Sequence, residues 1–268
     1  MDSKEESFNS TQTKKWETFY SKPLKELTKL IHKHYKEEES LELEVRLGKY
    51  DFETERFEAG VSAEFFYGLL KALLRYKHWE NIKEEEEKEE KQEQENLEWT
   101  ITTEIYYSKC IRRIMKGKCD LNNKSSIRPS TYQKKKKISD LTMHLKNRLY
   151  DIRFGIKTEL SIDPPSFQFL ASEIKCVRIK YRYSFILTKA HFRIDFTKVY
   201  AGDTEAEALE QKEPTSYEIE MEYLPSTVAN QEEKIALTLF INTLNLFHTT
   251  NTASSSSSNN NKIEIQLL

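Results

Sequence analysis

An α+β fold, built around an antiparallel sheet or barrel, is predicted by three features of this sequence. Segments with apolar residues at helical spacing lie near both ends of the chain. Between them lies a succession of short segments in which apolar and charged residues alternate, a pattern typical of β-strands. The length of 268 residues suffices for one sizeable barrel or two small domains. No internal repeat and no long apolar run is present, so neither a solenoid nor a membrane helix is expected.

Helices are expected in three places. Apolar residues recur at near-helical spacing from Lys14 to Tyr35, and Pro23 is expected to divide this stretch into two short helices. Ser62 is a suitable N-cap for a helix with a buried apolar stripe that runs to about Trp79. A third helical pattern, over Thr227–Phe247, predicts a helix packed outside the sheet.

Strands are expected wherever apolar and polar residues alternate over a short segment. The expected strands are Leu41–Leu47, Trp99–Tyr107, Cys110–Lys116, Tyr132–Ser139, Tyr150–Leu160, Val177–Leu187, Ala190–Tyr200 and Tyr217–Tyr223. Residues 201–216 are expected to form a loop. This organisation predicts an N-terminal helical segment (1–40), one domain (41–250) and a low-complexity Ser/Asn-rich tail (251–268).

The charge of the chain is unevenly distributed. The formal net charge is only −2, but residues 83–98 contain nine Glu against three Lys. That run has no apolar period and is interpreted as an exposed acidic insertion. Residues 112–157 contain fourteen Lys or Arg against three Asp. Such a basic stretch indicates a polyanionic ligand, with a solvated charged surface as the alternative.

Two of the expected strands carry rows of carboxylates, because alternate residues of a strand point to the same side. The carboxylates that share a face are Glu42 and Glu44 in the first strand and Glu218, Glu220 and Glu222 in the last. Like charges on one strand face oppose folding unless a cation lies among them. Carboxylate oxygens are ligands that Mg²⁺ and Mn²⁺ prefer. The alternative is that both strands are half-exposed, with their Glu side chains in water.

Other strands carry basic residues on one face and apolar residues on the other. The charged faces consist of Asp151 with Arg153, of Arg178 with Lys180 and Arg182, and of Arg193 with Asp195 and Thr197. Helices with apolar stripes are available to cover the apolar faces. The charged faces then point either to solvent or into a closed barrel. In the second case acidic and basic strands would form a tunnel for a metal ion and for phosphate oxygens.

The charged motifs of these strands, taken in their order along the chain, resemble those of the fungal and protozoal mRNA-capping RNA triphosphatases. That family belongs to the triphosphate tunnel metalloenzymes. The matching elements are Glu42-x-Glu44, Lys137-Ile-Ser-Asp-Leu141 followed by Tyr150-Asp-Ile-Arg153, Arg178-x-Lys180-x-Arg182, Asp195-x-Thr197 and Glu218-x-Glu220-x-Glu222. The resemblance covers about Leu41 to Tyr223 and implies a closed antiparallel eight-stranded β-barrel with helices packed outside. The acidic insertion and the Ser/Asn tail depart from the family pattern.

The resemblance also implies roles for these residues. Glu42, Glu44 and Glu222 would bind the divalent metal, Mg²⁺ or Mn²⁺. Glu220 would position or activate the attacking water, and Glu218 would belong to the same acidic wall. Arg153, Lys180 and Arg182 would hold the γ-phosphate, supported by Arg178, Asp195 and Thr197. The role of Arg46 stays open, as do the tunnel residues between Trp99 and Lys137.

The activity that the resemblance implies is hydrolysis of the β–γ bond of 5′-triphosphate RNA, the first step of mRNA capping. Phosphoryl transfer mainly requires in-line positioning and charge neutralisation, which such a tunnel would provide. One alternative on the same fold is a hydrolase of small triphosphates such as tripolyphosphate or nucleotides. Another is a non-catalytic barrel that binds RNA through its basic strands.

Expectations about partners follow from the same resemblance. Capping requires a guanylyltransferase, and no Lys-x-Asp-Gly motif occurs here, so a guanylyltransferase on a separate chain is expected. A homodimer is possible, and no membrane partner is expected. Cellular capping implies a nuclear location, whereas a virus or cytoplasmic genetic element would imply the cytoplasm.

Overall fold

The computed structural model describes residues 21–35, 41–75, 99–107, 110–116, 130–144, 148–163, 173–187, 192–224, 235 and 242–243. The helices are α2 (Ser21–Tyr35), α3 (Ala63–Leu74) and α4 (Glu205–Glu210). The strands are β1 (Leu41–Asp51), β2 (Arg56–Ala59), β3 (Thr100–Tyr107), β4 (Ile111–Lys116), β5 (Ser130–Met143), β6 (Asp151–Ile162), β7 (Ile174–Leu187), β8 (Phe192–Gly202) and β9 (Ser216–Tyr223). None of the helices in these ranges could span a membrane.

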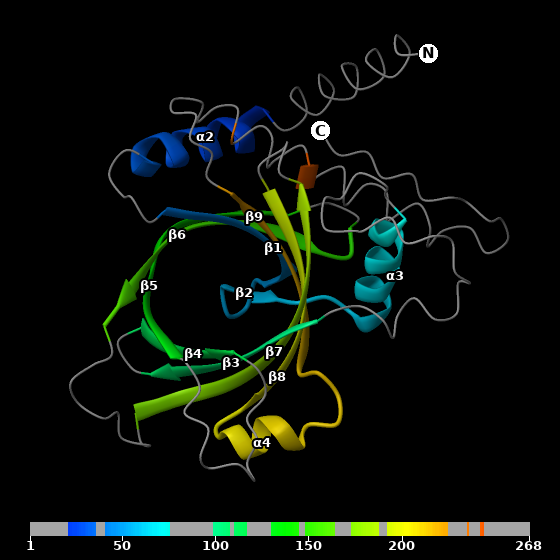
Figure 1. Ribbon diagram of the computed structural model, residues 1–268. Helices are drawn as coiled ribbons and strands as arrows, with labels where there is room; N and C mark the ends of the chain where they lie inside the picture. The colour runs from blue at the N-terminus through cyan, green and yellow to red at the C-terminus, as the bar shows by residue number, and fades with distance from the viewer. Residues whose placement is uncertain are drawn as a thin grey trace, which may run out of the picture.

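The strands form a closed antiparallel barrel. Their order is β2-β1-β6-β5-β4-β3-β7-β8-β9, and β1 also pairs with β9, so eight strands close the ring while β2 forms a hairpin with β1. The view in Figure 1 looks along the axis of this ring. Closure places the first and last long strands side by side, with Glu44 opposite Glu222 and Arg46 opposite Glu220. The predicted α+β fold with a closed eight-stranded barrel is confirmed.

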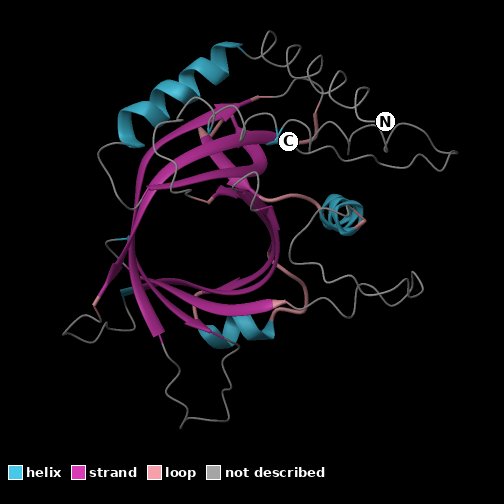
Figure 2. Ribbon diagram, turned by 45° about the horizontal axis from the view of Figure 1, so that its top comes forward, coloured by secondary structure: helices cyan, strands magenta, loops and turns pink. Residues whose placement is uncertain are grey.

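The apolar core lies outside the ring, between the strands and the helices. Outward-facing residues such as Val45, Phe154 and Phe196 pack with Leu27 and Ile31 of α2 and with the α3 stripe. Figure 2 shows the helices on the outer surface of the barrel. At roughly 25 cal/mol per Å² of apolar surface, this burial is the main stabilising contribution. It also leaves the inner face of every strand free to carry charge.

The helices of the structure agree in part with those predicted from the sequence. Pro23 does not divide α2, because the helix begins at Ser21 and Pro23 falls in its first turn, where its missing N–H costs no hydrogen bond. The other predicted N-terminal helix lies outside the described residues. Ser62 caps α3 as predicted by accepting a bond from the Phe65 N–H, and the helix ends at Leu74 rather than near Trp79. Only Ile235, Asn242 and Thr243 of the predicted C-terminal helix are described, and they are helical and buried.

The predicted loop over residues 201–216 was wrong in its middle. The segment contains the short helix α4, whose N-cap Thr204 accepts a bond from the Glu207 N–H. Two glutamates in its first turn favour this helix, because they complement the positive end of its dipole. Strand β5 extends beyond the predicted 132–139 and contains a bulge between Lys137 and Ser139, which interrupts the alternation. The acidic run 83–98 and the tail 251–268 lie outside the described residues.

Gly48 is required where β1 pairs with two strands at once. Its register partners are Asp151 of β6 and Ala59 of β2, and an added Cβ would overlap the carbonyl oxygen of Glu58. Gly48→Ala is expected to destabilise the protein by about 2 kcal/mol, measured as a lower urea midpoint. Gly68→Ala is the matched control, because nothing lies within 4 Å of its added Cβ and alanine should stabilise α3 by about 1 kcal/mol. Equal midpoints for the two variants would contradict the close approach.

Candidate active site

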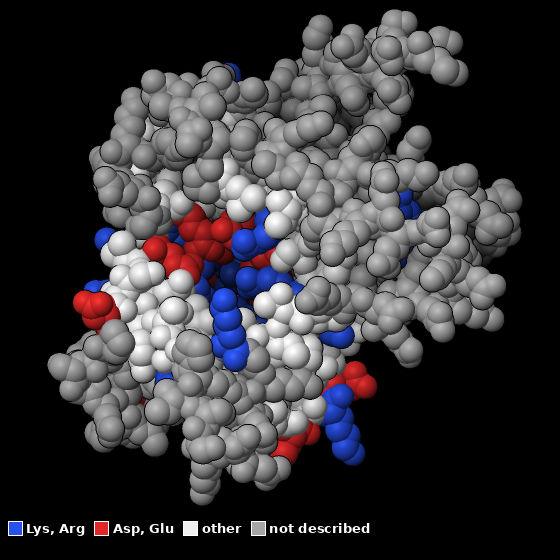
Figure 3. All heavy atoms as spheres, in the orientation of Figure 1, with Lys and Arg blue, Asp and Glu red and all other residues white. Residues whose placement is uncertain are grey.

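Charged side chains line the inside of the barrel. Strand register places on the inner face the residues Glu42, Glu44, Arg46, Glu104, Arg112, Lys135, Arg153, Lys157, Glu159, Arg178, Lys180, Arg182, Arg193, Asp195, Thr197, Glu218, Glu220 and Glu222. Figure 3 shows acidic and basic atoms gathered around the opening in the ring. Every site residue predicted from the sequence therefore faces the same interior.

The two acidic strands are neighbours in the barrel. Glu44 and Glu222 are direct partners across the β1–β9 pair, and Glu44 is only 3% exposed. Glu44 lies over Gly155 of β6, where an added Cβ would be 3.3 Å from its carboxylate oxygen. Glycine at this position therefore leaves room for the Glu44 side chain. Two carboxylates directly opposite each other, one of them buried, are unfavourable unless cations lie between or beside them.

Arg46, whose role the sequence left open, is one such cation. Its guanidinium lies 2.8 Å from a carboxylate oxygen of Glu44 and 2.7 Å from one of Glu220. Burial alone would lower the pKa of Arg46, but Glu220 and Glu44 outweigh it and raise that pKa above its usual value. Arg46 therefore stays charged and bridges the acidic residues of β1 and β9.

The carboxylates Glu220 and Glu222 differ in their environment. Burial would raise the pKa of Glu220, but Arg46, Lys180 and Arg182 outweigh it and hold that pKa well below its usual range. Burial raises the pKa of Glu222 to about 7, because the opposing charge of Arg193, 2.6 Å away, is insufficient to offset it. Glu220 is therefore ionised at any physiological pH, whereas Glu222 lacks sufficient positive charge around it.

The basic row of β7 lies across from acidic partners. Arg178 pairs with Glu218, and the ammonium of Lys180 lies 2.8 Å from a carboxylate oxygen of Glu104. The guanidinium of Arg182 lies 3.5 Å from a carboxylate oxygen of Asp195. The inner surface is thus an interleaved network of charges, and not one acidic wall that faces one basic wall.

Asp195 and Thr197 occupy supporting positions on β8. Asp195 accepts a hydrogen bond of 2.6 Å from the Ser184 hydroxyl and pairs with Arg193 at 2.9 Å. Thr197 is 1% exposed and lies between Arg182 and Glu218 in the strand register. These contacts orient Arg182 and Arg193 toward the interior.

Several tunnel residues were missed by sequence reasoning. These are Glu104 on β3, Arg112 on β4, Lys135 on β5, and Lys157 and Glu159 on β6. Arg112 pairs with Glu159 and lies 3.5 Å from Glu104, while Lys157 pairs with Glu44. Lys135 lies 2.8 Å from Glu42 and 3.5 Å from Glu159. Alternation alone could have indicated Glu104, the single carboxylate of its strand, and Lys157 and Glu159, which continue the parity of Arg153.

Arg153 lies apart from this network. Its guanidinium stacks over the ring of Phe57 at 4.5 Å, and it forms no ion pair with a carboxylate in the described part of the chain. Burial, and then the neighbouring Arg46, lower the pKa of Arg153. Its register partner on β1 is Arg46. Arg153 is therefore a half-buried cation at which burial and Arg46 outweigh Glu44, Asp140 and Glu220, and this suits an anion-binding position.

The acidic residues of β1 and β9 fit a divalent cation by their chemistry. Within the described ranges, no three acidic, His or Cys side chains already converge on one point, because Arg46, Lys135, Lys157 and Arg193 occupy the carboxylates. The direct opposition of Glu44 and Glu222, and the raised pKa of Glu222, show negative charge that these cations do not fully neutralise. Hard oxygen donors of this kind suit Mg²⁺ or Mn²⁺.

A protein-family model matches the part of the chain that forms the barrel and its helices. The model of the family described as "mRNA capping enzyme, beta chain" matches residues 21–244. The chain belongs to this family. This membership confirms the predicted activity, that of an RNA 5′-triphosphatase of mRNA capping. No curated protein matches the sequence.

Solved structures of RNA triphosphatases share the fold of this chain. Pct1 RNA triphosphatase of S. pombe in complex with the Spt5 CTD is 17% identical, with 84% of this chain and 92% of that chain covered and a TM-score of 0.56. A second structure of S. pombe Pct1 RNA triphosphatase is 19% identical, with 87% of this chain and 83% of that chain covered and a TM-score of 0.53. The RNA triphosphatase domain of the mimivirus mRNA capping enzyme is 17% identical, with 84% and 94% covered and a TM-score of 0.50.

Proposed function

We propose that this chain hydrolyses the β–γ phosphoanhydride of 5′-triphosphate RNA in a reaction that depends on Mg²⁺ or Mn²⁺, and so produces 5′-diphosphate RNA and phosphate. The observation that carries the proposal is the direct opposition of Glu44 and Glu222 inside a barrel whose inner face also carries many Arg and Lys side chains. The Arg and Lys side chains attract a polyanion, and a divalent ion held by the carboxylates would offset their repulsion of that polyanion.

The phosphate-binding part of the proposal assigns the γ-phosphate oxygens to Lys180, Arg182 and Arg153, with Arg178 beside them. Arg forks bind phosphate oxygens bidentately, whereas Lys provides a point charge. Without substrate, Lys180, Arg182 and Arg178 pair with Glu104, Asp195 and Glu218. The triphosphate would take over these cations, which all extend from β7 and are held in place by carboxylates of β3, β8 and β9.

Glu42, Glu44 and Glu222 would hold the metal ion, which supplies charge neutralisation at the phosphate oxygens when it is bound. Glu220 stands beside them on β9, with Arg46 at 2.7 Å. Because its pKa is well below the usual range, Glu220 is a weak proton acceptor. Its proposed role is to orient the attacking water by accepting a hydrogen bond, rather than to remove the proton before attack.

The test is release of γ-labelled phosphate from a short 5′-triphosphate RNA, measured with Mg²⁺, with Mn²⁺ and with a chelator. We expect release with either metal, at least a tenfold loss with chelator, and recovery when the metal is returned. Tripolyphosphate and ATP are assayed in parallel.

The outcomes separate the alternatives. Hydrolysis of tripolyphosphate or ATP without hydrolysis of RNA would identify a hydrolase of small triphosphates on the same fold. RNA binding that is untouched by chelator, with no turnover of any triphosphate, would identify a non-catalytic RNA-binding barrel. Release that persists in chelator would contradict the proposed metal dependence.

The expected partners stay predictions that accompany this proposal. The 5′-diphosphate product requires a guanylyltransferase, which we propose acts from a separate chain. Co-purification of the two, or sequential action on one RNA, tests this.

A homodimer is tested by light scattering. A nuclear location, proposed for cellular capping, is tested by imaging a tagged chain, and a cytoplasmic signal would instead indicate capping by a virus or cytoplasmic element.

A further inference from the structure

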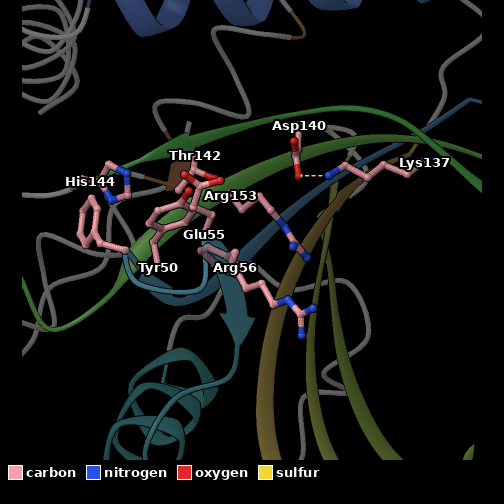
Figure 4. Close-up of a pocket in the computed structure, with 10 residues that line it drawn as sticks. Tyr50, Glu55, Arg56, Lys137, Asp140, Thr142, His144 and Arg153 are labelled. Carbon is pink, nitrogen blue, oxygen red and sulfur yellow. Dashed lines mark ion pairs between the residues drawn. The ribbon is translucent and has the colours of Figure 1, made fainter.

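A pocket of about 730 Å³ lies at the end of the barrel where β1 turns into β2. Its walls come from the β1–β2 hairpin, the end of β5 and the start of β6 (Figure 4). We call it the mouth pocket and define it by Tyr50, Phe52, Arg56, Lys137, His144 and Arg153. Its volume is in the range of sites that bind small organic molecules.

One end of the mouth pocket is aromatic. The rings of Tyr50, Phe52 and His144 contact one another, with centroids 5.1 Å apart for Tyr50 and Phe52, 5.0 Å for Tyr50 and His144, and 4.9 Å for Phe52 and His144. Phe52 is 72% exposed, although large apolar side chains elsewhere on the barrel pack beneath helices. An exposed phenylalanine supported by two further rings offers a stacking surface for another flat ring.

The other end of the mouth pocket is cationic. In Figure 4 the guanidinium groups of Arg56 and Arg153 point in the same direction, away from Tyr50 and His144. Arg153 is the link to the tunnel, because it lines the pocket and is the register partner of Arg46. Tyr50 lies four residues further along β1 than Arg46, which corresponds to roughly 13 Å. The aromatic end of the mouth pocket therefore lies about this distance beyond the charged interior, measured along β1.

We propose that the mouth pocket binds the first nucleoside of the substrate, with its base stacked on Phe52 and the phosphate nearest the nucleoside held by Arg56, next to Arg153 at the border of the tunnel. The inference rests on the proposed function for its orientation, since the terminal phosphate would lie in the tunnel. A nucleoside joined to phosphates has the polarity of this pocket, with a flat ring at one end and negative charge at the other. Lys137, 2.5 Å from Asp140, adds a polar pair on the same wall.

This site would make the enzyme distinguish substrates that carry a base from inorganic polyphosphate. Stacking on one aromatic side chain is sequence-tolerant, because every base has a π-face. The mouth pocket would therefore favour RNA 5′ ends and free nucleoside triphosphates over tripolyphosphate, without strong preference among the bases. RNA 5′ ends and free nucleoside triphosphates share the nucleoside 5′-triphosphate group, and the experiment distinguishes between these two substrates.

The experiment compares kcat and KM of wild type, Phe52→Ala and Phe52→Trp on three substrates: a short 5′-triphosphate RNA, ATP and tripolyphosphate. We expect Phe52→Ala to raise KM about fivefold or more for the RNA, for ATP, or for both, with tripolyphosphate unchanged. Phe52→Trp should restore the wild-type KM, because indole also stacks. Leu160→Ala is the matched control, since Leu160 is an exposed apolar side chain outside the pocket and should change none of the three.

A second measurement is independent of turnover. Fluorescence anisotropy of the same RNA, labelled at its 3′ end and kept in chelator, reports binding by wild type and Phe52→Ala. We expect the labelled RNA to bind more weakly to Phe52→Ala than to wild type. Tripolyphosphate is then used to displace the labelled RNA from each protein, and its affinity should be the same for both.

Different results would overturn the two proposals separately. Equal KM values for wild type and Phe52→Ala on RNA and ATP, or an equal loss on tripolyphosphate, would overturn the nucleoside site. An effect on ATP alone, with RNA not hydrolysed by wild type, would keep the site and reject RNA as substrate. If wild type hydrolyses nothing, the proposed activity fails, and unchanged RNA binding by Phe52→Ala would overturn the site as well.

Discussion

Glu220→Gln is expected to reduce kcat for phosphate release by about a thousandfold, through loss of the carboxylate that orients the attacking water. Glutamine keeps the shape of the side chain but removes the negative charge that Arg46, Lys180 and Arg182 maintain on Glu220. Its amide can also present an N–H where the water requires an acceptor. The measurement is release of γ-labelled phosphate under saturating RNA and metal.

The Glu220→Gln result is interpretable only if the variant still folds and binds substrate. Circular dichroism reports the fold, and competition by tripolyphosphate reports the phosphate site, where we expect a change smaller than about threefold. Glu213→Gln is the matched control, because Glu213 is an exposed glutamate shortly before β9 and should retain wild-type kcat. A Glu220→Gln enzyme that retains kcat would remove Glu220 from the proposed mechanism.

Glu104→Gln is expected to lower the free energy of unfolding by about 3 kcal/mol at neutral pH. Glu104 is 4% exposed and has two cations beside it, Lys180 at 2.8 Å and Arg112 at 3.5 Å. Burial alone would raise the pKa of Glu104, but Lys180 and Arg112 outweigh it and lower that pKa from 4.5 to about 2. A shift of that size corresponds to a similar energy, about 3 kcal/mol. The measurement is urea unfolding of both proteins.

The pH dependence of this effect has a defined sign. A carboxyl whose pKa is lowered by folding stabilises the protein above its unfolded pKa, here near 4.5, and this contribution is lost as the pH falls toward 2. The difference between wild type and Glu104→Gln should therefore be constant near pH 7 and shrink below about pH 4.5. Glu58→Gln, at an exposed glutamate of β2, should change the unfolding midpoint little.

A double variant tests the origin of the Glu104 effect. Removing Lys180 as well, as Glu104→Gln with Lys180→Met, removes the cation that the single variant leaves without its carboxylate partner. We expect the double variant to be more stable than Glu104→Gln alone. If the two substitutions simply add, the carboxylate and the ammonium do not stabilise each other across the β3–β7 pair.

The sequence by itself determined which side chains could share a face. A strand has a period of two, so alternation assigned the rows of β1, β7, β8 and β9 to one side and the apolar residues to the other. The short motifs then allowed the family resemblance that the family comparison confirmed. Prediction failed where another principle acted: Thr204 caps a short helix in the predicted loop, and a bulge near Ser139 shifts the alternation of β5.

Only the tertiary structure decided which charges meet. Glu44 pairs with Lys157, and Glu104 pairs with Lys180, across separations in the chain that no local pattern encodes. Closure between β1 and β9 set Glu44 opposite Glu222 and gave Arg46 two acidic partners. The hairpin that brings Phe52 beside His144 is equally non-local. The physical reason is that alternation depends on the geometry of one strand, whereas ion pairs depend on register and closure of the whole ring, which are set by long-range pairing.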